Sequence, residues 1–298
     1  MHGTSDLILN DVPFIVYRTS NFFMDITAPI GIFDSGYGGL TVFKEIRKLL
    51  PEYDFLYLGD NARSPYGSRS FEVIHEFTLE AVQWLFNQGC NLVILACNTA
   101  SAKALRTIQQ RDLARIAPYK RVLGVIRPTT EMIGNISRSR HIGILGTQGT
   151  IASESYTIEI KKFFPDIQVT GEACSMWVAL VENGQHNTPG ADYFIKQNLE
   201  NIFKKDSEID TLILACTHYP LLEDRIRTFL PKHIQLISQG PYVALSLKDY
   251  LLRHPEIDEK CSKNGISRFV TTESEEKFMN MASVFLNGEI RAQKIELR

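Results

Sequence analysis

Short apolar runs alternate along this chain with longer segments whose apolar residues recur every three or four positions. The short runs, at 30–33, 55–58, 92–96, 142–145, 167–169 and 212–215, are predicted to be buried strands. The longer segments predict helices at 40–50, 70–88, 151–164 and 176–182, and Pro51, Gly89 and Pro165 follow three of them. Regular alternation of this kind predicts mostly parallel sheets with helices on both faces.

The two halves of the chain look like diverged copies. Gly-Ile-Phe-Asp-Ser at 31–35 is similar to Gly-Ile-Leu-Gly-Thr at 143–147, and these segments begin 66 and 73 residues before Cys97 and Cys216. The interval is too long for a solenoid repeat. We therefore predict an α/β fold of two pseudo-symmetric, doubly wound domains, each with a mostly parallel central sheet flanked by helices.

Cys97 and Cys216 stand at matching places in this duplication. Each ends an apolar strand and is followed by small polar residues, Asn98 and Thr99 in the first copy and Thr217 in the second. Open α/β sheets place their chemistry at the carboxyl ends of such strands. A lone cysteine there is more often a small buried hydrophobe. The repeat instead favours a site with one thiol on each side of a substrate, which suits moving a proton between the two faces of a carbon.

Backbone N–H groups follow each of these cysteines and are expected to lower the pKa of the thiols. Cys90, Cys174 and Cys261 lack this setting, so we expect them to be structural.

Four further segments carry candidate site residues, each with a plainer reading. Asp34 and Ser35 precede a glycine-rich turn, where an Asp commonly caps a helix or turn, but a carboxylate there could also orient an ammonium group or assist a thiol. Tyr66 and Gly67 lie in a Pro-Gly-Ser loop at the same sheet edge.

Two ionisable residues of the second half are candidates as well. His218 follows Cys216 by two residues and is either a surface histidine or a group that stabilises a thiolate or carries a proton. Glu182 is, from spacing alone, a carboxylate at a helix end.

Composition excludes several classes of function. A net charge of −2 gives no basic surface for nucleic acid, and no apolar run reaches the roughly 18 residues of a membrane span. The first residues lack the basic start, apolar block and cleavage site of a secretory signal. Five cysteines at irregular spacing fit a reducing cytoplasm rather than a disulfide framework.

The sequence also argues against a cofactor. The turn Gly-Tyr-Gly-Gly at 36–39 lacks the dinucleotide-binding spacing, and there is no phosphate-binding loop. The cysteines and histidines do not have metal-ligand spacing either. We expect a small-molecule substrate and no metal.

Five ordered motifs resemble those of glutamate racemases. They are Gly-Ile-Phe-Asp-Ser-Gly-Tyr-Gly-Gly-Leu-Thr-Val at 31–42, Gly-Asp-Asn-Ala-Arg-Ser-Pro-Tyr-Gly at 59–67, Ala-Cys-Asn-Thr-Ala-Ser at 96–101, Gly-Thr-Gln-Gly-Thr-Ile at 146–151 and Ala-Cys-Thr-His-Tyr-Pro-Leu-Leu at 215–222. Phe-Val-Thr-Thr-Glu-Ser at 269–274 is similar to that family too. The resemblance covers about 28–288, nearly the whole chain.

The resemblance implies a cofactor-independent enzyme that interconverts L- and D-glutamate in the cytoplasm and supplies D-glutamate for peptidoglycan. Cys97 and Cys216 match the two acid/base cysteines, Asp34 matches the carboxylate beside the first, and His218 and Glu182 match the groups assisting the second. The substrate-binding residues of the family match Asp34, Ser35, Tyr66, Gly67, Asn98, Thr99, Thr217 and His218. We also expect a homodimer.

The chain departs from the family pattern in two loops. Thr129 stands where a glycine is usual, and Ile-Ser-Gln at 237–239 replaces the more usual Val-Asp-Ser. Residues 1–27 precede the family's usual start, and such extensions are associated in some members with control by a cell-wall precursor. The expected division is this extension, a first domain of 28–123 with 240–298, and a second domain of 124–239, with the active site in the cleft between the two domains.

Other functions remain open at this point. A related racemase acting on aspartate or hydantoins would use the same two thiols. A thiol hydrolase would need only one cysteine with His218 and would form an acyl-enzyme. A glutamate sensor without catalysis would tolerate the loss of either thiol.

Overall fold

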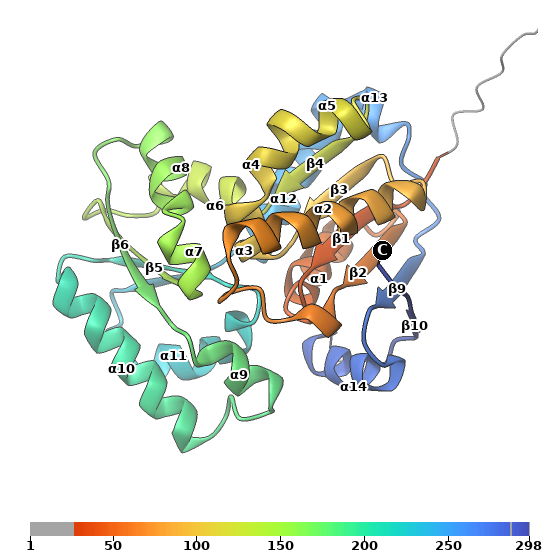
Figure 1. Cartoon of the computed structure of the whole chain (residues 1–298). Coiled ribbons are helices and arrows are strands. Elements are labelled where there is room, and N and C mark those ends of the chain that lie inside the picture. The colour runs from red at the N-terminus through yellow and green to blue at the C-terminus, as the bar shows by residue number, and fades with distance from the viewer. Residues whose placement is uncertain (1–26, 287, 298) are drawn as a thin grey trace, which may run out of the picture.

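The computed structural model describes residues 27–286 and 288–297, which form two lobes, each built on its own parallel sheet (Figure 1). The expected N-terminal extension lies outside the described residues except for Thr27. No helix within the described ranges is long and apolar enough to cross a membrane.

The sheet of the first lobe has six strands in the order β10-β9-β2-β1-β3-β4, all parallel. Their bounds are β1 Ile30–Asp34, β2 Phe55–Gly59, β3 Leu92–Leu95, β4 Arg121–Gly124, β9 Ser267–Thr271 and β10 Ala292–Lys294. The last two strands come from the end of the chain and extend the sheet beyond β2. They return the chain to the first lobe after the second lobe is complete.

The sheet of the second lobe has four parallel strands in the order β6-β5-β7-β8. They are β5 His141–Gly146, β6 Gln168–Ala173, β7 Thr211–Ala215 and β8 Gln235–Ser238. This order repeats β2-β1-β3-β4, so β5 corresponds to β1 and β7 to β3. The predicted pair of parallel-sheet α/β domains is confirmed, while the residue boundaries of the division stay a prediction.

At least one helix lies between each of these strands and the next along the chain. In the first lobe they are α1 Leu40–Leu49, α2 Phe71–Asn87, α3 Asn98–Lys103, α4 Leu105–Thr107, α5 Leu113–Ile116, α12 Gly240–Arg253, α13 Pro255–Asp258 and α14 Glu275–Leu286. A π-helical turn at Ile108–Asp112 joins α4 to α5, and 3-10 turns lie at Asn61–Arg63 and Tyr219–Leu222. The remaining helices are α6 Ile126–Ile133, α7 Gln148–Ala152, α8 Ser155–Phe163, α9 Trp177–Glu182, α10 Pro189–Lys205 and α11 Glu223–Phe229.

One helix predicted from the sequence is wrong because it is not continuous. The expected continuous helix at 151–164 is two helices, α7 and α8, because Glu154 adopts a left-handed conformation with φ of 54°. The sequence does not reveal this break, because apolar residues continue on both sides of Glu154 and no Gly or Pro stands between Ile151 and Phe164.

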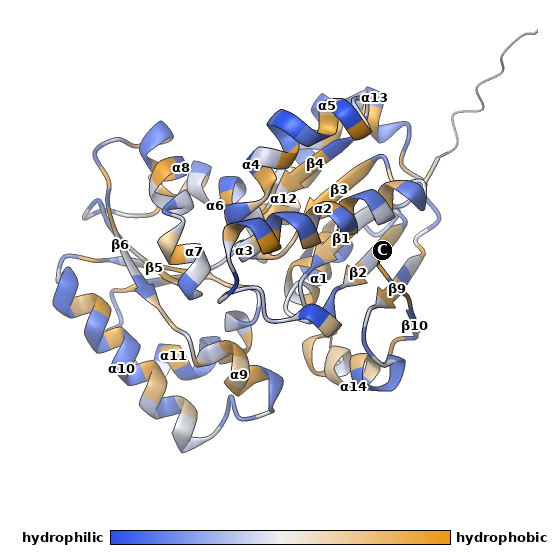
Figure 2. Cartoon of the chain, in the orientation of Figure 1, coloured by the Kyte–Doolittle hydropathy of each residue, from blue (hydrophilic) through white to orange (hydrophobic). Residues whose placement is uncertain are grey.

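The core lies between the sheets and their helices. Every residue of β1, β2, β3 and β7 is buried. Helix α1 buries Leu40, Phe43 and Ile46 against the sheet and ends with two exposed basic residues. In Figure 2 the strands are mostly apolar, and the helices carry polar residues on their outer faces. This pattern is what a sheet buried on both faces requires.

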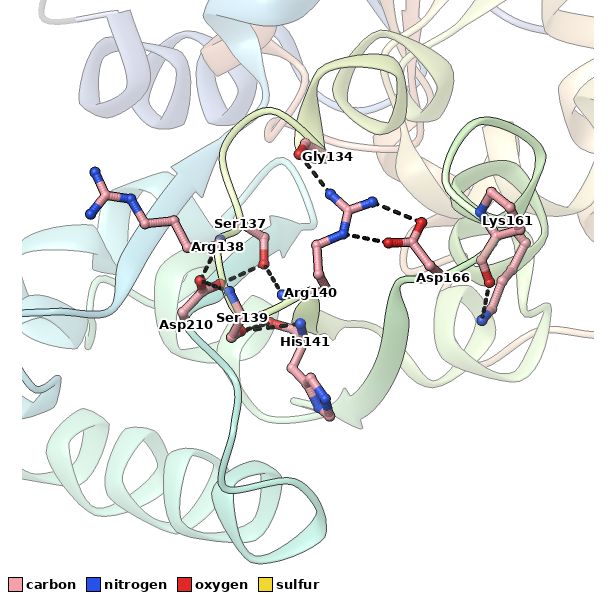
Figure 3. Close-up of polar contacts among 10 residues, drawn as sticks. Gly134, Ser137, Arg138, Ser139, Arg140, His141, Lys161, Asp166 and Asp210 are labelled. Atoms are coloured by element: carbon pink, nitrogen blue, oxygen red, sulfur yellow. Dashed lines mark hydrogen bonds and ion pairs between the residues drawn. The ribbon is translucent and has the colours of Figure 1, made fainter.

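The loop that enters β5 is fixed by two carboxylates (Figure 3). Asp210 accepts hydrogen bonds from the Ser137 hydroxyl at 2.7 Å and from the backbone N–H groups of Arg138 at 2.6 Å and Ser139 at 2.7 Å. Arg140, whose φ is 65°, is held by a bidentate pair with Asp166 at 2.7 and 2.8 Å. The polar contacts therefore compensate for an unfavourable backbone conformation.

Replacing Asp210 with Ala is expected to lower the free energy of unfolding by about 2–4 kcal/mol, because the donors of this loop lose a charged acceptor. Burial alone would raise the pKa of Asp210, but these donors outweigh it and lower the pKa below its usual value. The difference between wild type and variant should therefore be full above about pH 4 and shrink as the pH falls further.

Chemical denaturation from pH 7 to pH 3 measures this difference. The control is Asp249→Ala, which removes only an exposed helical ion pair with Arg253 and should change stability by less than about 0.5 kcal/mol. Equal effects of the two substitutions would contradict the role given to Asp210.

Candidate active site

The carboxyl ends of the two sheets meet between the lobes. Asp34 ends β1 and Cys97 follows β3 in the first lobe, whereas Cys216 follows β7 in the second. The Thr217 hydroxyl donates to Asp34 Oδ2 at 3.3 Å, and the Thr41 hydroxyl donates to the Thr217 carbonyl at 3.0 Å. The topology therefore brings together segments about 180 residues apart in sequence.

Gly38 allows this close approach. A Cβ atom at this position would lie 2.3 Å from Thr217 Oγ1 and 2.5 Å from His218 Nδ1. Neither distance is compatible with van der Waals contact, so only glycine fits while the lobes keep this spacing.

Cys97 is buried in the first lobe and is 5% exposed. Its Sγ is 3.3 Å from the Ser35 hydroxyl and accepts the Ala100 N–H at 3.4 Å. Burial, followed by the negative charge of Asp34, raises the pKa of Cys97 to about 12, although Ser35 and Ala100 act in the opposite direction. The expectation of a lowered pKa is thus wrong for this thiol, because desolvation exceeds the effect of the helix N-terminus.

Asp34 is 1% exposed and has a defined orientation. Its Oδ1 accepts the Gly36 N–H at 2.9 Å, and its Oδ2 accepts the Thr217 hydroxyl. Burial raises the pKa of Asp34, while the charge of His218 and these donors lower it in part. The carboxylate therefore serves both as a turn residue, as the plainer reading held, and as a charged group beside Cys97.

Cys216 has a different set of neighbours. His218 Nδ1 lies 3.9 Å from Cys216 Sγ, and His218 Nε2 lies 2.9 Å from Glu182 Oε1. Burial alone would lower the pKa of His218, but hydrogen bonds to Cys216 and Glu182 raise it to about 10. His218 is 5% exposed and packs edge-on against Phe285, so it is not a surface histidine.

Tyr66 and Gly67 lie in the loop that crosses to the second lobe. The Tyr66 hydroxyl donates to Asp60 Oδ2 at 2.5 Å, and its ring packs near Phe33 and Phe77. The Gly67 carbonyl accepts the Gly149 N–H at 2.8 Å. The Tyr66 side chain therefore belongs to the core, and Gly67 brings the loop into contact with the second lobe.

Asn98 and Thr99 begin α3 directly after Cys97 and are 2% and 3% exposed. The Asn98 amide bonds to Gln239 at 2.7 Å and to the Tyr156 hydroxyl at 2.6 Å. The Thr99 and Thr147 hydroxyls are 3.0 Å apart. Sequence reasoning missed Gln239, Tyr156 and Thr147 as neighbours of the site. Thr147 lies in the family-like motif at 146–151, and Gln239 lies in the loop at 237–239 that departs from the family pattern, so both had a signal in the sequence. Nothing in the sequence marked Tyr156.

The described part of the chain contains no group of three or more His, Cys, Asp or Glu side chains arranged to hold a metal ion. Cys90, Cys174 and Cys261 are free and buried, and the Cys174 carbonyl accepts the Tyr219 hydroxyl at 3.0 Å. What the site offers chemically is two sulfur atoms, one from each lobe, with different charged partners. Cys97 adjoins a carboxylate and a hydroxyl, and Cys216 adjoins an imidazole that is itself paired with a carboxylate.

Comparisons with known proteins identify the family to which the chain is similar. Residues 30–241 match the Asp/Glu/Hydantoin racemase family. A glutamate racemase from Sulfurihydrogenibium sp. (strain YO3AOP1) is 40% identical over 272 residues, which cover 90% of this chain and 97% of the relative.

Two solved structures are similar over nearly their whole length. Glutamate racemase isoform RacE1 from Bacillus anthracis has a TM-score of 0.82 at 36% identity, covering 91% of this chain and 98% of its own. Glutamate racemase from Francisella tularensis subsp. tularensis SCHU S4, solved with D-glutamate, has a TM-score of 0.81 at 32% identity, covering 92% and 99%. The fold, the paired strand-end cysteines and these matches together show that the chain belongs to the aspartate, glutamate and hydantoin racemase family of isomerases.

Proposed function

We propose that this chain interconverts L- and D-glutamate without a cofactor, by a two-base proton transfer at Cα in which Cys97 and Cys216 act from opposite faces. The observation that carries the proposal is the placement of one thiol at each of two equivalent strand ends, in lobes held together by the Gly38 contact. A hydrolase using one thiol would leave the second without a role.

The choice of glutamate rests on the relatives. The similar proteins named above are glutamate racemases, and one was solved with D-glutamate. The proposal includes supply of D-glutamate to peptidoglycan, a cytoplasmic location and a homodimer, as the family resemblance implies. The alternative within the family is a racemase for aspartate or hydantoins.

The charges around the thiols favour one resting state. A protonated His218 places a positive charge 3.9 Å from Cys216 Sγ and stabilises a thiolate there. Cys97, with its raised pKa and the neighbouring Asp34, remains a thiol. One thiolate and one thiol are what a two-base exchange needs at the start of a turnover.

The reaction then moves two protons and exchanges the protonation states of Cys97 and Cys216. The Cys216 thiolate removes the Cα proton of L-glutamate, and the Cys97 thiol delivers its proton to the opposite face of the carbanion. After D-glutamate is released, Cys216 is a thiol and Cys97 is a thiolate. This form of the enzyme acts on D-glutamate. The carbanion is stabilised by donors at Ser35, Asn98, Thr99 and Thr217.

Closure of the lobes contributes to this step. Cys97 and Cys216 are 5% and 6% exposed, so entry of substrate requires the lobes to separate. The Cα proton of glutamate is only weakly acidic, so the carbanion formed by its removal must be stabilised. Exclusion of water on closure strengthens the electrostatic interactions that do this. Asp34 is placed to orient the substrate ammonium group.

Replacing either thiol by serine is expected to abolish racemisation, with kcat reduced by about 10³-fold or more, because a serine hydroxyl is a far weaker acid and base at neutral pH. Cys216→Ser should still exchange the Cα hydrogen of D-glutamate, and Cys97→Ser that of L-glutamate. NMR of each enantiomer in D2O, with no added cofactor, measures both quantities. Cys90→Ser, which changes a buried thiol outside the site, is the matched control.

Several outcomes would contradict the proposal. Racemisation by either single variant at near wild-type rate would remove the two-base mechanism. A wild-type protein that does not racemise glutamate but racemises aspartate or a hydantoin would show that the chain is the alternative racemase of this family. An acyl-enzyme detected by mass spectrometry would favour the hydrolase, and binding without turnover would favour a sensor.

Replacing Glu182 with Gln is expected to move the basic limb of the pH profile of kcat/KM to lower pH. Glu182 helps to raise the pKa of His218 to about 10, so its loss lets the imidazole lose its proton at lower pH and removes the charge beside Cys216. Because the equilibrium constant between enantiomers is one, kcat/KM should fall by the same factor in both directions.

Initial rates between pH 6 and pH 10.5 test this expectation, starting from each enantiomer. Glu208→Gln, on the exposed surface of the second lobe, serves as the control and should reproduce the wild-type profile. A profile for Glu182→Gln that coincides with that of the control would contradict the role of the Glu182–His218 pair.

A further inference from the structure

Three buried side chains form a closed ring of hydrogen bonds beside the first thiol. Asn98 Nδ2 donates to Gln239 Oε1 at 2.7 Å, Gln239 Nε2 donates to the Tyr156 hydroxyl at 2.5 Å, and that hydroxyl donates to Asn98 Oδ1 at 2.6 Å. Asn98 begins α3, Tyr156 lies in α8 of the second lobe, and Gln239 joins β8 to α12. All three are at most 3% exposed.

The direction of every bond in this ring is determined by one backbone carbonyl. Gln239 Nε2 also donates to the Val125 carbonyl oxygen at 3.1 Å, and a carbonyl can only accept. The nitrogen of Gln239 must therefore face Val125, and its second proton goes to the Tyr156 oxygen. The single proton of Tyr156 then goes to Asn98 Oδ1, which leaves Asn98 Nδ2 facing Gln239 Oε1.

Tyr156 keeps its proton throughout the working pH range. Burial, followed by the charge of Cys216, raises the pKa of Tyr156 well above its usual value. The ring consequently has one hydrogen-bonding pattern rather than two that exchange.

The ring accounts for one of the two protons on Asn98 Nδ2. The other finds no acceptor among residues 27–286 and 288–297. We propose that Gln239 and Tyr156 are positioning residues that hold the Asn98 amide in a single orientation, with this remaining N–H available to a carboxylate of the substrate. The inference rests on the proposed function, because it assigns the residues that orient a donor of that same site.

A flipped Asn98 amide shows what the ring prevents. Rotation by 180° would place Oδ1 against Gln239 Oε1, two acceptors that cannot bond to each other, and Nδ2 against the Tyr156 hydroxyl. The bond to Gln239 would be lost, and the Tyr156 proton would lose its acceptor. The rotation would also direct a carbonyl oxygen, in place of an N–H, at an anionic substrate. In a water-poor site such a change opposes binding of the carboxylate and stabilisation of the carbanion.

The ring depends on the length of residue 239. Ile-Ser-Gln at 237–239 stands where the resembling family usually has Val-Asp-Ser. A serine at 239 is too short to join Asn98 to the Val125 carbonyl. The positioning of Asn98 by Gln239 is thus a property of this chain's own residues.

Tyr156→Phe and Gln239→Leu test the inference. Each is expected to lower kcat/KM for glutamate by about tenfold or more, since a displaced donor weakens transition-state binding. The matched controls are Tyr53→Phe and Gln109→Leu, which remove the hydrogen bond to Asp258 and the one to the Val122 carbonyl, both in the first lobe and away from the ring. The controls should stay within about twofold of wild type.

A double-substitution cycle separates positioning from simple support of the fold. In an Asn98→Ala background, Gln239→Leu and Tyr156→Phe should lower kcat/KM no further, because they act through Asn98. Full multiplicative losses in that background, or ring variants that behave as the controls do, would overturn the inference.

A second readout does not depend on racemase activity. In 15N spectra, the side-chain NH2 pair of Asn98, identified by its loss in Asn98→Ala, should shift in Tyr156→Phe and Gln239→Leu but not in the controls. An unchanged pair would overturn the ring even in an active enzyme. A wild type that fails to racemise glutamate while this pair shifts as expected would instead count against the proposed function alone.

Discussion

The close approach of Gly38 to Thr217 and His218 is the contact on which the rest of the site depends. It allows the turn after β1 in the first lobe to lie directly against the Thr217 and His218 side chains of the second lobe. Each sheet alone would present a single cysteine at a strand end. Together they present two, and the Thr217 to Asp34 hydrogen bond joins the two edges.

The surroundings of the two thiols are unequal although the strands that carry them are equivalent. Cys97 adjoins a buried carboxylate, and Cys216 adjoins a histidine whose pKa is raised to about 10. A duplicated fold has therefore acquired opposite electrostatics at its two matching positions. The difference supports the proposed assignment of one thiol and one thiolate to the resting enzyme. In that proposal the two cysteines exchange roles during turnover, which is how a single site would act on both enantiomers.

Much of the fold was predictable because its signals are local. Apolar runs marked β1, β2, β3, β5 and β7, and the cysteines that follow β3 and β7 indicated the sheet edge at which the candidate site lies. The repeated Gly-Ile motif indicated the duplication that the matching strand orders confirm. The break at Glu154 was missed because no Gly or Pro marks it in the sequence, although the Glu154 backbone is left-handed.

Other features depend on contacts between distant segments, which a single sequence does not encode in any local pattern. The short strands β4 and β10 belong to this group. So does Tyr156, an ordinary aromatic residue of a helix that becomes part of the site only through Asn98 and Gln239. The return of residues 240–298 to the first lobe was expected from the family resemblance and not from a local pattern. The thiol pKa of Cys97 was predicted in the wrong direction because burial is a tertiary property.

The central claim is that the proton removed from one face and the proton delivered to the other belong to different groups. The most direct measurement is the isotope content of the first D-glutamate formed from unlabelled L-glutamate in D2O by the wild-type protein, sampled before five per cent conversion. The account predicts that this product carries deuterium at Cα in nearly every molecule, because its hydrogen comes from a thiol equilibrated with solvent. Product that retains the substrate's own hydrogen would show that a single group carries the proton across, and would contradict the account.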